Sequence, residues 1–222
     1  MPLMDALSAE WFKPESVTIV DKDNLLQSWL SDEEIARLSG APKESQVIIS
    51  LVDGNVELRV KNRILSEDMV RLLVQNDDHS GYSCYIVNSV FVVDPYWQNK
   101  GIGARSVAIE ILQAQRLKIV TKITTYAVGN YQAFLASNLP LRGYYVWAVM
   151  GFDGDLPPTT LDALPEKFKD CKKVLDLVTS PEGRDVWKQH GQSVTLSFDL
   201  ADERCWNQLR AYMSNRQIEV EL

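Results

Sequence analysis

Residues 92–105 read VVDPYWQNKGIGAR, and they place Gly101 and Gly103 between an apolar, strand-like run and a helix-like run. Glycine lets the backbone approach a ligand without a Cβ atom in the way. The free N–H groups and the dipole of a helix start attract a negative group. The stretch therefore predicts an anion-binding loop, and a diphosphate suits such a loop well.

The residues on either side of this loop predict a strand, the loop, a helix and a second strand, in that order. Residues 82–93 are rich in Val, Ile, Tyr and Phe, which is typical of a buried strand. Apolar residues recur at helical spacing from residue 103 to about residue 116. Residues 119–128 return to a strand pattern.

Further elements are predicted upstream and downstream. Residues 22–39 predict two short helices closed near Gly40, with a capping-box pattern at residues 31–34. Asp53-Gly54-Asn55 favours a hairpin between two β-rich runs because this turn composition tolerates positive φ. The remaining expected elements are a strand at 69–75, a helix at 131–137, an apolar strand or helix end at 144–152, a loop at 153–158, a helix from about 180 to 191, a strand at 194–200 and a helix at 203–213.

Two common phosphate-binding patterns do not fit the loop. The dinucleotide fingerprint is incomplete because Ser106 stands where its third glycine belongs, and the pattern GxxxxGK[ST] occurs nowhere in the chain. A Gly-x-Gly turn that serves only tight packing is the structural alternative.

The loop resembles the coenzyme A loop of the GNAT acetyltransferases, [QR]-x-x-G-x-[GA] after a strand that ends in Val-x-Pro. This sequence supplies Val93-Asp94-Pro95 and then Gln98-Asn99-Lys100-Gly101-Ile102-Gly103. After the next strand, Asn130-Tyr131-Gln132-Ala133 is similar to the N-x-x-A pattern of the family, and Gly151-Phe152 is similar to its closing Gly-Phe. The resemblance covers roughly residues 47–152.

That resemblance implies an α/β (α+β) acyl-CoA N-acyltransferase fold, with a mixed, mostly antiparallel sheet and helices on both faces. The site is expected where the strand ending at Val93 parts from the strand ending at Val128. Backbone N–H groups of the loop would bind the pyrophosphate, and neighbouring residues would contact the pantetheine arm. The implied cofactor-binding residues are Val92, Val93, Gln98, Asn99, Lys100, Gly101, Ile102, Gly103, Ala104 and Asn130.

The catalytic residues that the resemblance would supply are displaced in this chain. Many members of the family carry a carboxylate on the strand before the loop, which acts as the general base, but this strand offers only Asn88 and Ser89 as polar residues. Trp147 stands where many members carry a tyrosine that acts as the general acid. The general base is unassigned. Tyr145, with Tyr144 beside it, is the predicted general acid, and the alternative is that these aromatic residues fill core volume.

Composition restricts the partners and the compartment. The formal charge is −7, from 30 acidic and 23 basic residues, so there is no basic field to hold nucleic acid. No stretch approaches the ~18 apolar residues of a membrane span, and the N-terminal residues do not read as an export signal. Three scattered cysteines suggest reduced thiols, a cytoplasmic location and no metal site.

The sequence as a whole predicts an N-acyltransferase that moves an acetyl group from acetyl-CoA, or another acyl-CoA, to a primary amine of a small molecule or protein. Residues 1–158 would form the acyl-CoA-binding core with a helical N-terminal segment, and residues 159–222 an extension that completes the same domain. The alternatives are a non-catalytic acyl-CoA-binding module and a structural or partner-binding protein. No feature predicts the acceptor or the oligomeric state.

Overall fold

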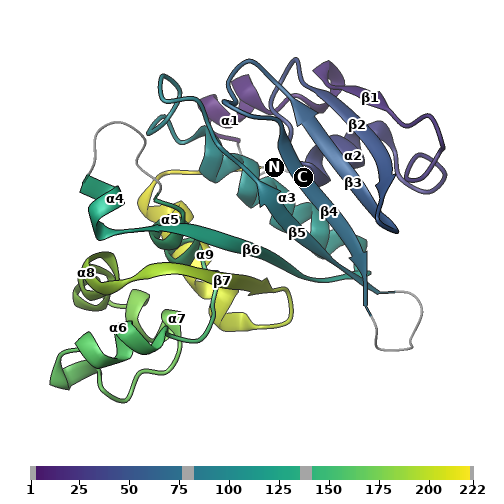
Figure 1. Cartoon of the computed structure of the whole chain (residues 1–222). Helices are drawn as coiled ribbons and strands as arrows, with labels where there is room; N and C mark the ends of the chain where they lie inside the picture. Colours follow the sequence, from purple (N-terminus) through teal and green to yellow (C-terminus); the bar gives the residue numbers. More distant parts are fainter. Residues whose placement is uncertain (1–3, 77–82, 136–141, 221–222) are drawn as a thin grey trace. The chain divides into compact units, whose positions relative to one another are not determined.

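The structure, a computed structural model, describes residues 4–76, 83–135 and 142–220 (Figure 1). The chain divides into two compact units, the first formed by residues 1–123 with 213–222 and the second by residues 124–212. The division between the units falls inside one long strand, β6 (Val120–Asn130). That residues 159–222 complete the domain formed by residues 1–158 stays a prediction.

The first unit contains a mixed, mostly antiparallel sheet, as predicted. Its strands follow one another in chain order; β1 pairs with β2 in parallel, and each of the next three pairs is antiparallel. The start of β6 lies beside the start of β5, since the N–H of Cys84 donates to the carbonyl of Ile119 (2.8 Å). The strands are β1 (Thr18–Val20), β2 (Gln46–Val52), β3 (Asn55–Lys61), β4 (Met69–Gln75) and β5 (Cys84–Val90).

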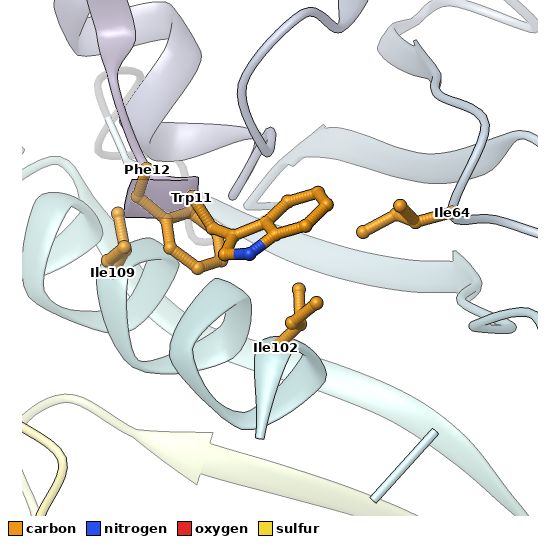
Figure 2. Packing of buried hydrophobic residues seen from close by; sticks show 5 residues of the cluster. All are labelled: Trp11, Phe12, Ile64, Ile102 and Ile109. Atoms are coloured by element: carbon orange, nitrogen blue, oxygen red, sulfur yellow. The ribbon is translucent and has the colours of Figure 1, made fainter. Parts of the chain in front are cut away.

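Helices cover one face of this sheet, and they lie behind the strands in Figure 1. The longest helix, α3 (Ile102–Leu117), packs against α1 (Ala6–Trp11) and α2 (Asp32–Leu38). Ile102 and Ile109 of α3 form a buried apolar cluster with Trp11, Phe12 and Ile64 (Figure 2). Burial of these side chains is the main source of stability for this layer. The elements are α1 (Ala6–Trp11), the 3₁₀ turn η1 (Pro14–Ser16), α2 (Asp32–Leu38) and α3 (Ile102–Leu117).

Local sequence signals account for several of these elements. The hairpin between β2 and β3 turns at Asp53 and Gly54, whose φ angles are +49° and +81°, so the predicted turn is confirmed. The capping box is confirmed too, because the Ser31 hydroxyl accepts the Glu34 N–H and the Glu34 carboxylate accepts the Ser31 N–H. The predicted bounds of β4 are those observed.

The first of the two helices predicted within residues 22–39 is wrong. That segment forms turns, and the carboxylate of Asp21 accepts the backbone N–H groups of Leu25, Leu26 and Gln27. An aspartate that bonds the backbone ahead of it gives the chain an alternative to the helix. Apolar spacing alone did not reveal this competition.

The second unit contains the rest of β6, the neighbouring strand β7 (Gln192–Asp199) and most of the shorter helices. Its core is aromatic: Phe152 packs edge-on against Trp147 and Phe198, and Trp187 is fully buried. The helical elements are α4 (Tyr131–Leu135), α5 (Gly143–Val149), α6 (Pro158–Ala163), the 3₁₀ turn η2 (Glu166–Phe168), α7 (Val174–Val178), α8 (Pro181–His190) and α9 (Glu203–Asn215).

The element predictions for this half are largely confirmed. The strand and the helices expected from residue 180 onward are β7, α8 and α9. The apolar run at 144–152, expected as a strand or a helix end, begins inside the helix α5 and continues three residues past its end at Val149. Residue 82 of the predicted strand and residues 136–137 of the predicted helix lie outside the described residues.

Candidate functional site

The chain beyond β5 is held by a short antiparallel bridge to the segment after β3. The carbonyl of Val92 accepts the N–H of Ser66 (2.9 Å), and the N–H of Asp94 donates to the carbonyl of Ile64 (2.8 Å). Because backbone groups alternate in direction along an extended chain, the N–H and carbonyl of Val93 point to the opposite side. Val93 therefore presents its backbone edge away from the bridge, whereas the carbonyl of Val92 is already used inside the fold.

A tight turn follows immediately. The N–H groups of Trp97 and Gln98 donate to the carbonyl of Asp94 (2.8 and 3.1 Å), and its carboxylate accepts the N–H of Tyr96 (2.9 Å). The side chain of Gln98 turns back, so that its Nε2 donates to the carbonyl of Val93 (2.8 Å). Asp94 and Gln98 thus fix the path of the loop relative to the end of the strand.

Left-handed backbone conformations bring the loop to the start of α3. Asn99 and Gly101 have φ angles of +60° and +78°, and Gly101 is the N-cap of α3 without a side-chain cap. The N–H of Arg105 donates to the carbonyl of Gly101 (3.3 Å). The N–H groups of residues 102–104 are those that a helix start leaves to other acceptors.

The two glycines differ in what a side chain would meet. A Cβ atom on Gly101 would lie 2.5 Å from Nη1 of Arg105 and would displace the end of that side chain, and the φ of +78° is one that other residues rarely adopt. A Cβ atom on Gly103 would lie 3.6 Å from the side chains of Phe91 and Val93, which is ordinary contact. Gly101 is therefore required by the turn, whereas Gly103 allows α3 to approach the segment that follows β5 closely.

Lys100 is a positively charged residue of the loop itself. Its Nζ lies 3.9 Å from the ring centroid of Tyr96 and 4.4 Å from that of Trp97, in cation–π geometry. Tyr96 is 71% exposed. The ammonium group of Lys100 thus lies over the aromatic rings of the turn.

A buried polar network lies between the middle of α3 and the sheet. Arg71 of β4 pairs with Glu110 of α3 (3.1 Å) and donates to Asn88 of β5 (3.0 Å), while Asn88 donates to Glu110 (3.1 Å). Arg71 and Glu110 are fully buried. Burial raises the pKa of Glu110 to about 7, and the opposing effects of Arg71 and Asn88 are smaller.

This network was not predicted, although the sequence holds a signal for it. Arg71 interrupts the otherwise apolar run MVRLLV, and Glu110 stands among the apolar positions of α3. A charged residue inside each of two buried patterns indicates that the two form a pair. Asn88, noted earlier as a polar residue of the strand, is committed to this pair.

The other predicted site residues belong to the second unit. Asn130 ends β6, and its Oδ1 accepts the N–H of Ala133 (2.9 Å), so within this unit it caps α4. The hydroxyl of Tyr144, a fully buried residue, donates to the carbonyl of Lys188 (2.6 Å). Burial, more than its charged and aromatic neighbours, raises the pKa of Tyr144 to about 12. These contacts agree with the interpretation of Tyr144 as a core residue.

Tyr145 is half-buried, and its ring centroid lies 6.4 Å from that of Tyr144. Gly151 of the Gly-Phe pair has a φ of +102°, and a Cβ atom there would lie 2.4 Å from the carbonyl oxygen of Cys205. The pair therefore has a packing role within the second unit. Of the predicted site residues, Val92, Val93 and residues 98–104 are together in the first unit, and the remaining three are in the second.

A pocket of about 180 Å³ lies elsewhere in the first unit and shares no residue with the loop. Its lining is apolar apart from Arg37 and consists of Met4, Phe12, Pro14, Ala36, Arg37, Ala41 and Ile109. Among the residues that the structure describes, no group of His, Cys, Asp or Glu is arranged to hold a metal ion. Likewise, none of the helices in the described ranges is long and apolar enough to cross a membrane.

Comparison with known proteins yields one structural similarity. No family model and no curated protein matches the chain. The crystal structure of the loading GNATL domain of CurA from Lyngbya majuscula matches with a TM-score of 0.32 and 12% sequence identity, over 81% of this chain and 87% of that chain. Because this TM-score is low, the function is inferred from the residues of this chain.

Proposed function

We propose that the protein is an acyl-CoA-dependent N-acyltransferase that moves an acetyl group from acetyl-CoA to a primary amine. One observation carries this proposal: the left-handed Gly101 precedes α3, and the first N–H groups of α3 have no side-chain cap. Such a start is suited to a diphosphate. The match of residues 93–103 to the coenzyme A loop of the GNAT acetyltransferases makes acyl-CoA the favoured ligand.

The end of the strand supports the same ligand. The N–H and carbonyl of Val93 face away from the bridge to the segment around Ile64. The carbonyl accepts the side-chain N–H of Gln98, so the N–H of Val93 is the group that an amide-containing arm would pair with. In the proposed complex the pyrophosphate lies on residues 98–104 and the pantetheine arm runs along Val93. Asn130 would contact the same arm.

The reaction would be direct acyl transfer. The amine nitrogen attacks the thioester carbonyl, the C–S bond breaks, and the proton that nitrogen loses balances the proton that the thiolate gains. Tyr145 is the proposed donor of the latter proton. A base within the first unit is not assigned, because β5 carries no carboxylate and Asn88 is held by the buried pair.

This last observation favours a second candidate function, a non-catalytic acyl-CoA-binding module. Binding requires only the loop and the strand edge, whereas turnover also requires a route for two protons. The two functions differ in one measurable property, which is the release of coenzyme A in the presence of an amine.

The test is a transfer assay with the purified chain, acetyl-CoA and a panel of diamines, aminoglycosides and peptides with free amino groups, read by mass spectrometry of the products. We expect an acetylated amine, and Tyr145→Phe should lower kcat by about tenfold or more with little change in KM for acetyl-CoA. Tyr144→Phe is the matched control: it should lower stability by about 1 kcal/mol and leave kcat nearly unchanged.

Equal kcat values for the wild type and Tyr145→Phe would remove Tyr145 from the mechanism. Binding of acetyl-CoA without any acetylated product would favour the binding module over the enzyme.

A further inference from the structure

Three distant parts of the first unit meet at Asp5. Its Oδ1 accepts the N–H groups of Leu7 and Ser8 (both 3.0 Å), which caps α1. Its Oδ2 accepts the N–H of Glu219 (2.9 Å), and its own N–H donates to the carbonyl of Glu219 (3.0 Å). The same carboxylate therefore joins the first helix to the C-terminal segment.

The third partner of Asp5 is Arg105, in the first turn of α3. Nη2 of Arg105 donates to Oδ1 of Asp5 (2.9 Å), and Nε donates to the hydroxyl of Ser8 (3.0 Å). The side chains of Arg105 and Asp5 are 8% and 16% exposed. A charge-assisted pair that is this well enclosed and bonded fixes the position of the guanidinium.

The remaining edge of the guanidinium reaches the loop. Nη1 of Arg105 donates to the carbonyl of Gly101 (3.1 Å). That carbonyl belongs to the same planar trans peptide as the N–H of Ile102, so fixing the C=O direction fixes the N–H in the opposite direction. This N–H is the first of the free amides at the helix start. Asp5 thus controls the orientation of that amide through Arg105.

The charges are consistent with this arrangement. A positive side chain at a helix N-terminus is unfavourable for the helix dipole, and the carboxylate of Asp5 offsets it. Burial alone would raise the pKa of Asp5, but hydrogen bonds from Ser8, Arg105 and Glu219 outweigh burial and hold the pKa well below its ordinary value. Asp5 therefore stays charged, and Arg105 stays paired, at any pH near neutrality.

We propose that Asp5 is a positioning residue for the anion-binding loop: it holds Arg105 against the carbonyl of Gly101, and so keeps the amide groups of residues 102–104 aligned for a diphosphate. The identity of the ligand in this inference rests on the proposed function, whereas the ordering of the loop by Asp5 does not. Preorganised amides lose less entropy on binding, so the affinity should depend on Asp5 even though Asp5 does not touch the ligand.

The test combines ¹⁵N relaxation of the free protein with calorimetric titration of acetyl-CoA, in the wild type and in Asp5→Asn. We expect the order parameters of the amides at residues 99–104 to fall from about 0.85 to below about 0.6 in Asp5→Asn. The dissociation constant should rise by about tenfold. The hydroxyl of Ser8 donates to Oδ2 of Asp5 (2.6 Å) and accepts from Nε of Arg105, so Ser8→Ala removes one bond to each member of the pair. It should shift both readouts in the same direction by less, and it replaces Asp5→Asn in the test if that variant does not fold.

Asp21→Asn is the matched control, since Asp21 also accepts several backbone N–H groups, but these come from Leu25, Leu26 and Gln27 and not from α3. It should leave the order parameters of residues 99–104 unchanged. Unchanged loop order in both Asp5→Asn and Ser8→Ala would overturn the inference. If the wild type binds no acetyl-CoA, the proposed function fails, while the relaxation data still decide whether Asp5 orders the loop.

Discussion

Two enclosed arginine–carboxylate pairs lie in the described part of the first unit, Arg105 with Asp5 and Arg71 with Glu110. The pKa of the carboxylate is shifted in opposite directions in the two pairs. Asp5 receives hydrogen bonds from Leu7, Ser8, Arg105 and Glu219, and its pKa is lowered. Glu110 receives them on Oε2, and its Oε1 has no donor among the described residues. The charged form of Glu110 is therefore incompletely compensated, and its raised pKa follows.

We expect the free energy of unfolding to fall as the pH rises from about 4.5 to about 7, because the folded state keeps a proton on Glu110 that the unfolded chain releases. The change is at most about 3–4 kcal/mol, from about 1.4 kcal/mol for each unit of the difference in pKa between the folded and unfolded states. Urea unfolding of the wild type and Glu110→Gln across this range measures it. A difference in stability between the two proteins that does not vary with pH would contradict the raised pKa.

At the scale of one element, the start of α3 is both a helix start determined by its local sequence and part of the proposed site. The left-handed Gly101 ends the loop, and the buried Ile102 anchors the first turn against Trp11 and Ile64 (Figure 2). Gly103 has room for a methyl group, whereas a methyl group on Gly101 would displace the end of the Arg105 side chain. The position of the helix start is therefore fixed by Gly101 and Ile102 rather than by a side-chain cap.

This difference predicts opposite effects of the same substitution. Gly101→Ala should lower the free energy of unfolding by about 1–2 kcal/mol, because alanine in the left-handed region is strained and its Cβ displaces Arg105. Gly103→Ala should be neutral or raise it by up to about 1 kcal/mol, because alanine favours the helix. Chemical denaturation measures both. Equal destabilisation by the two substitutions would contradict the described helix start.

Elements with a strong local signal could be predicted from the sequence. A short stretch of residues is enough to predict each of three features: the capping box at Ser31, the turn at Asp53-Gly54 and the helix α3. The turns around Asp21 could not be predicted in this way, because a side chain there competes with the helix that the apolar spacing suggested. Most of the predicted cofactor-binding residues lie in one contiguous loop, and their role in binding stays a prediction.

At the scale of the whole molecule, the contacts that support the loop join residues far apart in the sequence. Arg105 pairs with a carboxylate 100 positions away, and Glu110 pairs with an arginine of another element. A single sequence does not show which charged residues will meet, because such pairs are set by tertiary packing. The division at residue 123 is likewise a property of packing, and no change in composition marks it.

The central claim is that residues 98–104 bind the phosphate groups of coenzyme A, and calorimetric titration with acetyl-CoA and free coenzyme A tests it most directly. The account predicts dissociation constants of about micromolar order for the wild type. Gly103→Glu should abolish binding by charge repulsion, whereas the uncharged Gly103→Gln, of the same size, should retain more of it. Absence of binding by the wild type, or equal binding by Gly103→Glu, would contradict the account.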